Sequence, residues 1–248
     1  MHSIFETILF AALGGILPAI IWLWFWLKED SAHPEPSKYI FYTFIFGMIA
    51  VPAALIGQLV VNVIFLQENS IETFITTRPI LGTIAILGWA FLEEFFKFIA
   101  AYHGGLKRFS NDEPVDMMIY LITAALGFAA VENTLFLIAP IVAGETTTAL
   151  LTTNIRFVGA TLVHVGSSAI LGIFLAFSYF SLERIKKRYI ITGFTAATVL
   201  HAIFNLFIIK NNELLFKALL VVWIVIIIII PIFEKIKNIR LNKISNNV

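Results

Sequence analysis

Apolar residues along this chain gather into long runs, and each run is separated from the next by a short polar stretch. A run of about 20 apolar residues is long enough for an α-helix to cross the hydrocarbon core of a bilayer. The polar stretches, among them 67–79 and 144–154, are expected to be loops. We therefore predict an all-α membrane protein, a polytopic bundle of about seven transmembrane helices. The spans are predicted at residues 4–27, 39–66, 80–103, 115–139, 156–181, 190–209 and 214–233.

The composition agrees with a membrane protein and narrows what the chain can do. Of its 248 residues, 59% are hydrophobic and 13% are charged, and the charged share is about half that of a typical soluble domain. The chain has no cysteine, which excludes disulfides, thiolate catalysis and cysteine-ligated metals. The net charge is +1, and no basic run resembles a nucleic-acid binding segment, so nucleic acid is not an expected partner.

The ends of the chain and the charged loops predict an orientation. The first apolar run is too long for a cleaved signal peptide and lacks a basic segment before it, so we expect a retained first span. Lysine and arginine are concentrated in the first, third and fifth loops and in the C-terminal tail. Such loops normally face the cytoplasm. The N-terminus is therefore predicted outside and the C-terminus in the cytoplasm.

Charged and polar side chains inside the predicted spans are the clearest functional signal. A charge at the bilayer centre costs about 2.5–3.5 kcal/mol on insertion-based scales, so such residues normally pair with one another or serve a function. Here they occur on four consecutive spans, which suggests that they converge on one interior site. The residues are Glu93, Glu94 and Lys97 on the third span, Asp116, Glu132 and Asn133 on the fourth, Arg156 and His164 on the fifth, and His201 and Asn205 on the sixth.

Helical spacing distinguishes the two adjacent carboxylates of the third span. Glu93 and Lys97 are four residues apart and share a helix face. Glu94 points about 100° away from Glu93, so the two carboxylates need not do the same job. The span limits put Glu93 on the cytoplasmic side of the midplane and Glu132 on the outer side, and a tilted or broken helix would have to reconcile these depths.

Two or three carboxylates together with two histidines suit the activation of water. A carboxylate in a low-dielectric site can act as a general base and then as an acid. Histidines can stabilise the developing oxyanion or bind a divalent metal that activates the water. His201 and Asn205 share a helix face, where Asn205 could fix the imidazole tautomer or hold a substrate carbonyl. Each route leads to hydrolysis of an amide or a similar bond.

Each of these features also has a purely structural interpretation. Glu94 and Lys97 could be a buried ion pair, and Asp116 and Arg156 lie near span ends, where they could anchor at the interface. A lone histidine inside a membrane is more often a hydrogen-bonded contact between helices than a ligand. Structural roles would have to explain acids and histidines on four consecutive helices, so we favour a functional site.

Intramembrane proteases that use other chemistry than a glutamate–histidine site fit the sequence less well. The His-Glu-x-x-His motif of zinc site-2 proteases is absent, and an aspartyl protease needs two membrane aspartates, whereas only Asp116 lies near a span. A rhomboid-type serine site needs Gly-x-Ser-Gly; the segment Gly166-Ser167-Ser168-Ala169 comes close, with His201 on the next helix. That alternative leaves the glutamates unexplained, and hydroxyls in membrane helices usually bond back to backbone carbonyls.

Four short motifs, in order along the chain, resemble the PrsW-type intramembrane protease family, which is related to the type II CAAX prenyl endopeptidases and bacteriocin-processing membrane proteases. Residues 93–97 are similar to its Glu-Glu-x-x-Lys motif, and residues 111–116, leading to 127–133, resemble its loop-to-helix signature. The segments 156–164 and 201–205 resemble its third and last motifs. The matching residues span most of the chain.

The resemblance implies an intramembrane protease of glutamic or metallo type that cleaves a peptide bond of a membrane protein. It implies a single integral-membrane domain over residues 1–248 with a catalytic core at about 80–209. It further implies Glu93 or Glu94 as the general base, with histidines as metal ligands or oxyanion stabilisers. The implied catalytic residues are Glu93, Glu94, Glu132, His164 and His201, the supporting residues are Lys97, Asp116, Asn133, Arg156 and Asn205, and a divalent metal such as zinc would be held by Glu132, His164 and His201.

Two departures from the CAAX enzymes leave the use of a metal open. Lys97 lies one residue earlier than their usual arginine, and Glu132 stands where their Phe-x-x-x-His motif has histidine. The second departure removes a neutral ligand and adds an anion, so a glutamate-only mechanism does not transfer directly.

Two alternatives come from other functional classes. One is a proton-coupled transporter whose glutamates, lysine and histidines relay protons, although the chain lacks the repeats or matched broken helices of such transporters. The other is a non-catalytic membrane scaffold that binds a client helix. The expected partners are the lipid bilayer and a membrane-protein substrate, and the resemblance implies a single-span client such as an anti-sigma factor as one example. The expected location is the bacterial cytoplasmic membrane.

Overall fold

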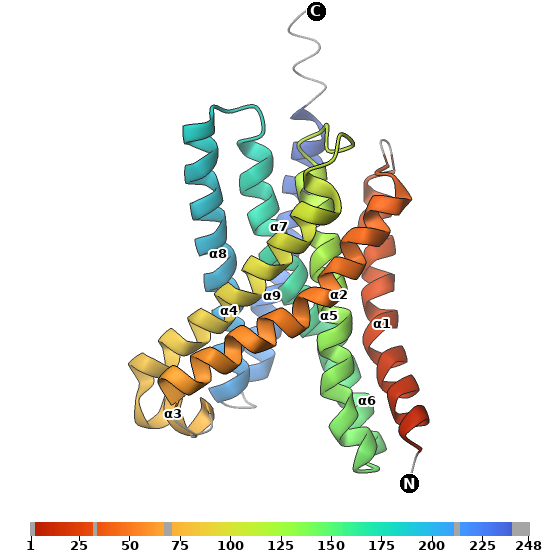
Figure 1. Ribbon diagram of the computed structural model, residues 1–248, viewed down its shortest axis with the longest axis vertical. Coiled ribbons are helices and arrows are strands. Elements are labelled where there is room, and N and C mark those ends of the chain that lie inside the picture. The colour runs from red at the N-terminus through yellow and green to blue at the C-terminus, as the bar shows by residue number, and fades with distance from the viewer. Residues whose placement is uncertain (1–2, 32–33, 67–70, 211–213, 240–248) are drawn as a thin grey trace, which may run out of the picture.

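The computed structural model describes residues 3–31, 34–66, 71–210 and 214–239, and all regular structure in these residues is helical. Long helices run alternately up and down in a bundle (Figure 1). The α-helices are α1 (Ile4–Glu29), α2 (Ser37–Val61), α3 (Ile71–Thr77), α4 (Pro79–Ala101), α5 (Asp116–Val142), α6 (Thr146–Ile155), α7 (Thr161–Phe177), α8 (Glu183–Lys210) and α9 (Leu215–Lys237), and the π-helical segments are η1 (Asn62–Leu66), η2 (Tyr102–Leu106) and η3 (Arg156–Ala160).

The predicted all-α polytopic membrane bundle is confirmed. Six helical stretches in the described residues are long and apolar enough to cross a membrane. Helix α4, which matches the predicted span 80–103, is not among these six; it has 23 residues and carries both adjacent glutamates and Lys97. In Figure 1, α1 begins at the lower end of the bundle and α9 ends at the upper end. The count of seven spans and the orientation of the termini stay predictions.

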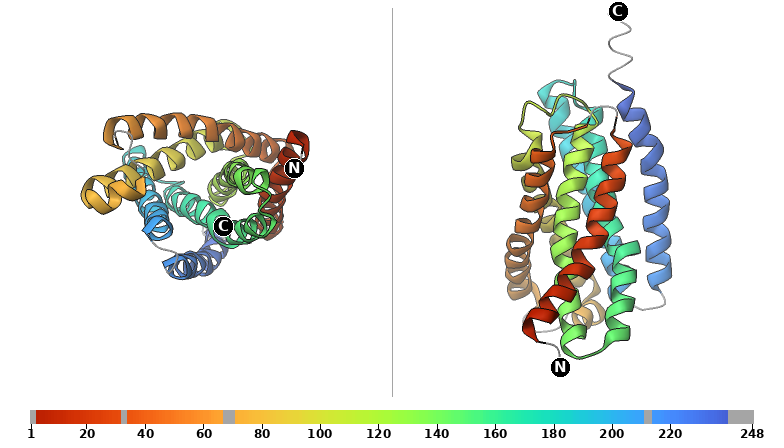
Figure 2. Two further views of the ribbon diagram at one scale, coloured as in Figure 1. Left: turned by 90° about the horizontal axis from the view of Figure 1, so that it is seen from below. Right: turned by 90° about the vertical axis from the view of Figure 1, so that its right-hand side faces the viewer.

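Helices α5 and α7 form the centre of the bundle. In α5, 67% of the most apolar window is buried, and in the Thr146–Phe177 stretch 78%, against 22% for α1, α2 and α9. Figure 2 shows α5 and α7 enclosed by the other helices. The outer helices expose large apolar side chains such as Ile8, Trp24 and Ile227. Such a continuous exposed apolar surface is what a bilayer covers.

Two glycines let α2 lie directly against α5. A Cβ on Gly127 would collide with the backbone carbonyl oxygen of Phe44, and a Cβ on Gly47 would collide with that of Ala124. Small residues at such crossings permit the close helix contact that is typical of membrane proteins. Both α2 and α4 are tilted, so their lower ends lie away from α5 (Figure 1, Figure 2).

The predicted loop at 144–154 is wrong, because α6 occupies most of it and continues through η3 into α7. Threonines in this segment bond back to the helix backbone; the Thr153 hydroxyl, for example, donates to the Ala149 carbonyl oxygen at 2.9 Å. A polar composition was therefore compatible with a helix. The combined stretch Thr146–Phe177 has 32 residues, which places Arg156 inside it and not at the start of a span. Helix α3 likewise occupies part of the predicted loop 67–79, of which residues 67–70 lie outside the described residues.

Candidate active site

Side chains from α4, α5, α7 and α8 meet at one cavity of about 510 Å³ inside the bundle. The carboxylates and imidazoles lie on its inner side, and its outer walls are apolar and partly exposed, with Leu55 at 43% and Phe136 at 55%. Glu93 and Glu132 lie 3.9 Å and 2.9 Å from the two ring nitrogens of His164, so the two carboxylates meet in one cavity although the span limits suggested different depths. The polar residues that line the cavity are Gln58, Glu93, Glu132, Arg156, His164, His201 and Asn205.

Glu94 is fully buried, and donors surround its carboxylate. Its Oε1 lies 2.6 Å from Lys97 Nζ, 2.7 Å from the Ser167 hydroxyl and 2.8 Å from His201 Nδ1. Its Oε2 accepts from the Ser168 hydroxyl at 3.0 Å. Lys97 therefore pairs with Glu94, and both side chains are 0% exposed. A carboxylate with this many donors is poorly placed to take a proton from water, and it ties α4 to α7 and α8.

Glu93, one residue earlier, is bound on one side only. Its Oε1 accepts an N–H from Gln58 at 2.8 Å, whereas its buried Oε2 has no hydrogen-bond partner within the described residues. That oxygen lies 3.5 Å from His201 Nε2 and 3.9 Å from His164 Nδ1. Because a buried carboxylate oxygen without a partner is costly, this centre is suited to hold a water molecule or a metal ion.

The two histidines are each held by a carboxylate on the side away from Glu93. His201 donates its Nδ1–H to Glu94, and His164 Nε2 lies 2.9 Å from Glu132 Oε2. The other nitrogen of each ring faces Glu93, and the two ring centroids lie 5.0 Å apart. Metal-binding histidines are oriented in this way, since the carboxylate fixes the tautomer and leaves the second nitrogen free as a ligand.

The donor set at this centre fits a divalent metal. One ligand atom from each of Glu93, His164 and His201 lies within 4.8 Å of the other two. Two histidines and one carboxylate, with a fourth position open, are a known ligand set of catalytic zinc. The predicted set had Glu132 in place of Glu93, but the structure places Glu132 behind His164. Lys97 Nζ lies 3.0 Å from His164 Nδ1, so a metal at that nitrogen would have to displace this contact.

Arg156 connects Glu132 to the π-helical segment that precedes α7. Its Nη2 lies 2.5 Å from Glu132 Oε2, and its Nε donates to Asn133 Oδ1 at 2.6 Å. Asn133 in turn donates to the Thr161 hydroxyl at 2.9 Å. Segments of π-helix are rare and frequently occur at functional sites, and η3 begins at Arg156. Through Glu132, this network fixes the position of His164.

Two of the predicted supporting residues lie outside these networks. Asn205 lines the cavity, but Glu94, and not Asn205, fixes the tautomer of His201. Asp116 is the first residue of α5 and lies about 24 Å along that helix from Glu132, at 1.5 Å of rise per residue. Its Oδ2 accepts the backbone N–H groups of the preceding loop, far from the cavity.

Three residues of the site were not predicted from the sequence. Gln58 could have been found, because it is a polar residue at membrane depth within the predicted span 39–66. Ser167 and Ser168, on which the serine-protease alternative depends, donate to Glu94. Since His201 Nδ1 is also bound to Glu94, the structure contains no Ser–His pair among these residues.

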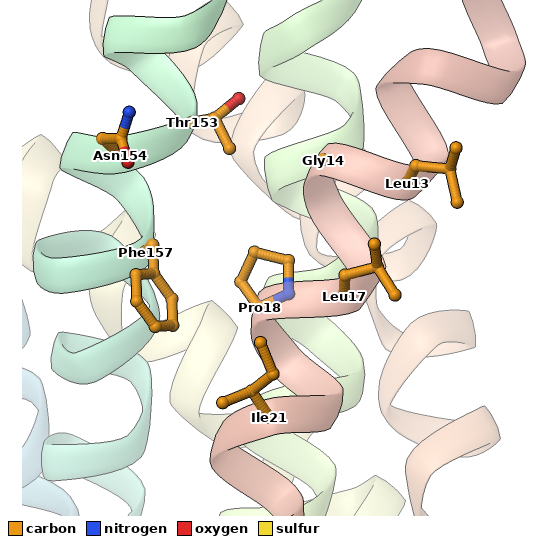
Figure 3. A pocket seen from close by; sticks show the side chains of 8 residues that line it. All are labelled: Leu13, Gly14, Leu17, Pro18, Ile21, Thr153, Asn154 and Phe157. Carbon is orange, nitrogen blue, oxygen red and sulfur yellow. The ribbon is translucent and has the colours of Figure 1, made fainter.

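A second hollow, of about 280 Å³, lies between α1 and the segment formed by α6 and η3 (Figure 3). Pro18 and Ile21 face Phe157 across it, and Thr153 and Asn154 line one edge. None of the acids or histidines described above lines this hollow, so it is separate from the candidate active site.

A helical membrane bundle that encloses a buried carboxylate and two carboxylate-anchored histidines in one cavity is typical of the class of integral-membrane enzymes. The match to known families gives the particular member of that class. The chain belongs to the PrsW family, because residues 35–232 match the model described as PrsW family intramembrane metalloprotease.

Curated relatives agree with this assignment, and each of the following is named Protease PrsW. The chain is 27% identical over 192 residues to the protein of Geobacillus kaustophilus, covering 77% of this chain and 76% of the relative. It is 26% identical over 217 residues to that of Halalkalibacterium halodurans, covering 85% and 90%. For Bacillus subtilis the identity is 24% over 196 residues, covering 77% and 79%. No solved structure matches the chain.

Family membership and fold together establish the class of activity and the membrane location. The chain is an intramembrane protease and a multi-pass bacterial membrane protein, and its substrates are membrane proteins within the lipid bilayer. The transporter and scaffold alternatives are not favoured.

Proposed function

We propose that the chain hydrolyses a peptide bond of a membrane-spanning client at the centre formed by Glu93, His164 and His201. The observation that carries this proposal is the buried Oε2 of Glu93, which has no partner among the described residues and lies between the inward-facing nitrogens of both histidines. A water molecule at that point is within reach of a proton acceptor and of a substrate in the same cavity. Glu93 takes the proton from this water and returns it to the leaving amine.

The negative charge that develops on the scissile carbonyl oxygen needs donors in the cavity. The guanidinium of Arg156 has five N–H groups, and its bonds to Glu132 and Asn133 leave some of them available. The side-chain amide of Asn205 lines the same cavity. We assign these two residues to the oxyanion, and we assign Glu94, Lys97 and Asn133 to positioning.

A divalent metal such as zinc, held by Glu93, His164 and His201, would supply Lewis-acid activation of the water or of the scissile carbonyl. The outward N–H groups of both histidines are already bound to carboxylates, which supports such a site. With Glu93 engaged as a ligand, Glu132 is the other carboxylate that lines the cavity. Glu93 is indispensable in either form of the mechanism.

The client is proposed to be a single-span membrane protein, with an anti-sigma factor of the same bacterium as the first one to test. The outer walls of the cavity are apolar and partly exposed, so a transmembrane segment can approach from the bilayer. Its peptide groups are hydrogen-bonded within a helix, so the segment must unwind locally before a carbonyl reaches Glu93. The proposed catalytic core, residues 80–209, supplies every lining carboxylate and histidine, and Gln58 is added to it from α2.

The test uses purified protein reconstituted with a tagged single-span client. Glu93→Gln preserves the contact with Gln58 but removes the proton acceptor, so cleavage is expected to fall by about 10²–10⁴-fold or more. Glu183→Gln, an exposed carboxylate on α8, is the matched control and should cleave normally. Cleavage by Glu93→Gln at the wild-type rate would sink the proposal.

Elemental analysis of the same preparations decides between the two forms of the mechanism. Near-stoichiometric zinc that is lost in a His164→Ala, His201→Ala double variant would establish a metal centre. An active, folded preparation without metal would assign water activation to the Glu93 carboxylate alone.

A further inference from the structure

A second group of carboxylates lies at the end of the bundle where α1 ends and α5 begins, at the top of Figure 1. It consists of Glu35 between α1 and α2, Asp112 in the loop before α5, and Asp116 in the first turn of α5. One carboxylate oxygen of each lies within 4.8 Å of the other two. Asp30, which follows α1, is close enough to interact electrostatically with Glu35 and Asp116. None of these acids belongs to the cavity described above.

Hydrogen bonds give this cluster a defined geometry. Asp116 Oδ2 accepts the backbone N–H groups of Asp112 at 2.9 Å and of Glu113 at 2.8 Å. The Tyr120 hydroxyl donates to Glu35. The loop before α5 and Glu35, which lies just before α2, are therefore already arranged around the carboxylates.

One carboxylate oxygen of the cluster and one of the neighbouring Asp30 lack donors. Asp116 Oδ1 and Asp30 Oδ2 are buried and have no hydrogen-bond partner in the part of the chain that the structure describes. The two side chains are only 1% and 4% exposed. Buried polar atoms in native proteins almost always have a partner, so these oxygens require either a proton or a bound cation.

No lysine or arginine within the described residues forms an ion pair with Glu35, Asp112 or Asp116. Within the described residues, no ion pair therefore compensates the negative charge that the three carboxylates bring to this partly buried site.

We propose that Glu35, Asp112 and Asp116 bind a hard divalent cation, Mg²⁺ or Ca²⁺, at a site separate from the candidate active site. Carboxylate oxygens are the preferred ligands of both ions, and water completes their coordination. Asp112 is exposed and Glu35 is half-buried, so the ion and its waters can enter from the aqueous side. The bound ion joins the α1–α2 connection to α5, the helix that carries Glu132 and Asn133.

The test uses the full chain in detergent, treated with EDTA and then titrated with Ca²⁺ or Mg²⁺ chloride by calorimetry. Saturable binding of one ion is expected, with a rise in Tm because the ion binds the folded state. The double variant Glu35→Gln, Asp112→Asn should bind at least about 10-fold more weakly, since two of three charged ligands are lost. Glu183→Gln should bind as wild type does, and so should Glu93→Gln, which separates this site from the candidate active site.

Two results would overturn the proposal. The first is the absence of saturable binding up to about 10 mM of either ion, which is about tenfold above the weak end of natural calcium sites, or equal binding by the double variant. The second is a metal-free protein that loses stability as the pH rises from about 5 to 8, while the double variant does not and added cations change nothing. That second result would mean that the cluster holds a shared proton.

Discussion

Glu93 and Glu94 are neighbours in the chain, but their surroundings give them different tasks. Because successive residues of a helix point in different directions, Glu94 faces the contact of α4 with α7 and α8. There Lys97, two serines and His201 donate to its carboxylate. The same helical geometry turns Glu93 toward the cavity, where one of its oxygens has no partner among the described residues. The first carboxylate is suited to chemistry and the second to holding the helices in place.

The buried ion pair of Lys97 and Glu94 leads to a stability prediction. Lys97→Met is expected to destabilise the protein by about 3–5 kcal/mol, because it leaves Glu94 as a buried charge without compensation. The double variant Lys97→Met, Glu94→Gln should recover much of that loss, since both charges are then removed. Thermal unfolding in detergent, followed by tryptophan fluorescence, measures the coupling between the two positions. A single variant as stable as wild type would argue against the pair.

At the residue scale, the sequence was informative wherever a side chain was costly in a membrane. The glutamates, Lys97 and the histidines stood out for that reason. Ser167 and Ser168 were considered only for the serine-protease alternative, and their bonds to Glu94 were not predicted, because hydroxyls in membrane helices normally bond to their own backbone. Which of Glu93 and Glu94 is free depends on donors from helices distant in the chain, and no local pattern contains that information.

At the scale of helices, the contact between α2 and α5 positions α2, whose Gln58 donates to Glu93. Gly127→Ala is expected to destabilise the protein by about 1–3 kcal/mol, because its Cβ would meet the Phe44 carbonyl oxygen and force the helices apart. Cleavage should fall with it, since α2 carries Gln58. Gly88→Ala on α4 is the control, because its nearest neighbour would be 3.9 Å away. Equal unfolding temperatures for the two variants would show that the backbones do not touch.

The apolar runs predicted the helices and their approximate positions, but they did not predict that the segment before α7 is helical. Residues 144–154 were predicted as a loop on the strength of their threonines and Asn154. In the structure the Thr153 and Asn154 side chains bond to carbonyl oxygens one turn earlier, so the polar composition does not interrupt the helix. The π-helical turn at Arg156 is also invisible to an apolar pattern, although it directs the guanidinium toward Glu132 and Asn133.

At the scale of the whole molecule, two polar sites occupy different depths of one apolar bundle. The candidate active site is enclosed by α4, α5, α7 and α8, whereas the carboxylate cluster lies at the end where α1 meets α5. Helix α5 belongs to both, because it begins at Asp116 and carries Glu132 further along. A cation bound at the carboxylate cluster would therefore act on the candidate active site through the position of α5. The cation would come from the compartment that the cluster's end of the bundle faces.

The orientation of the bundle can be measured directly because the chain has no cysteine. Single cysteines can replace four exposed residues, Arg78, Lys107, Glu145 and Glu183. These positions flank three successive crossings, by α4, by α5 and by the α6–α7 stretch, and test each of them separately. With the N-terminus outside, a membrane-impermeant maleimide should label positions 78 and 145 in intact cells, and positions 107 and 183 only after permeabilisation. The reverse labelling pattern would mean that the bundle has the opposite orientation, with the carboxylate cluster exposed to external cations. Labelling of 78 and 107 from the same side would mean that α4 does not cross the bilayer, and that the glutamates enter the membrane from one face only.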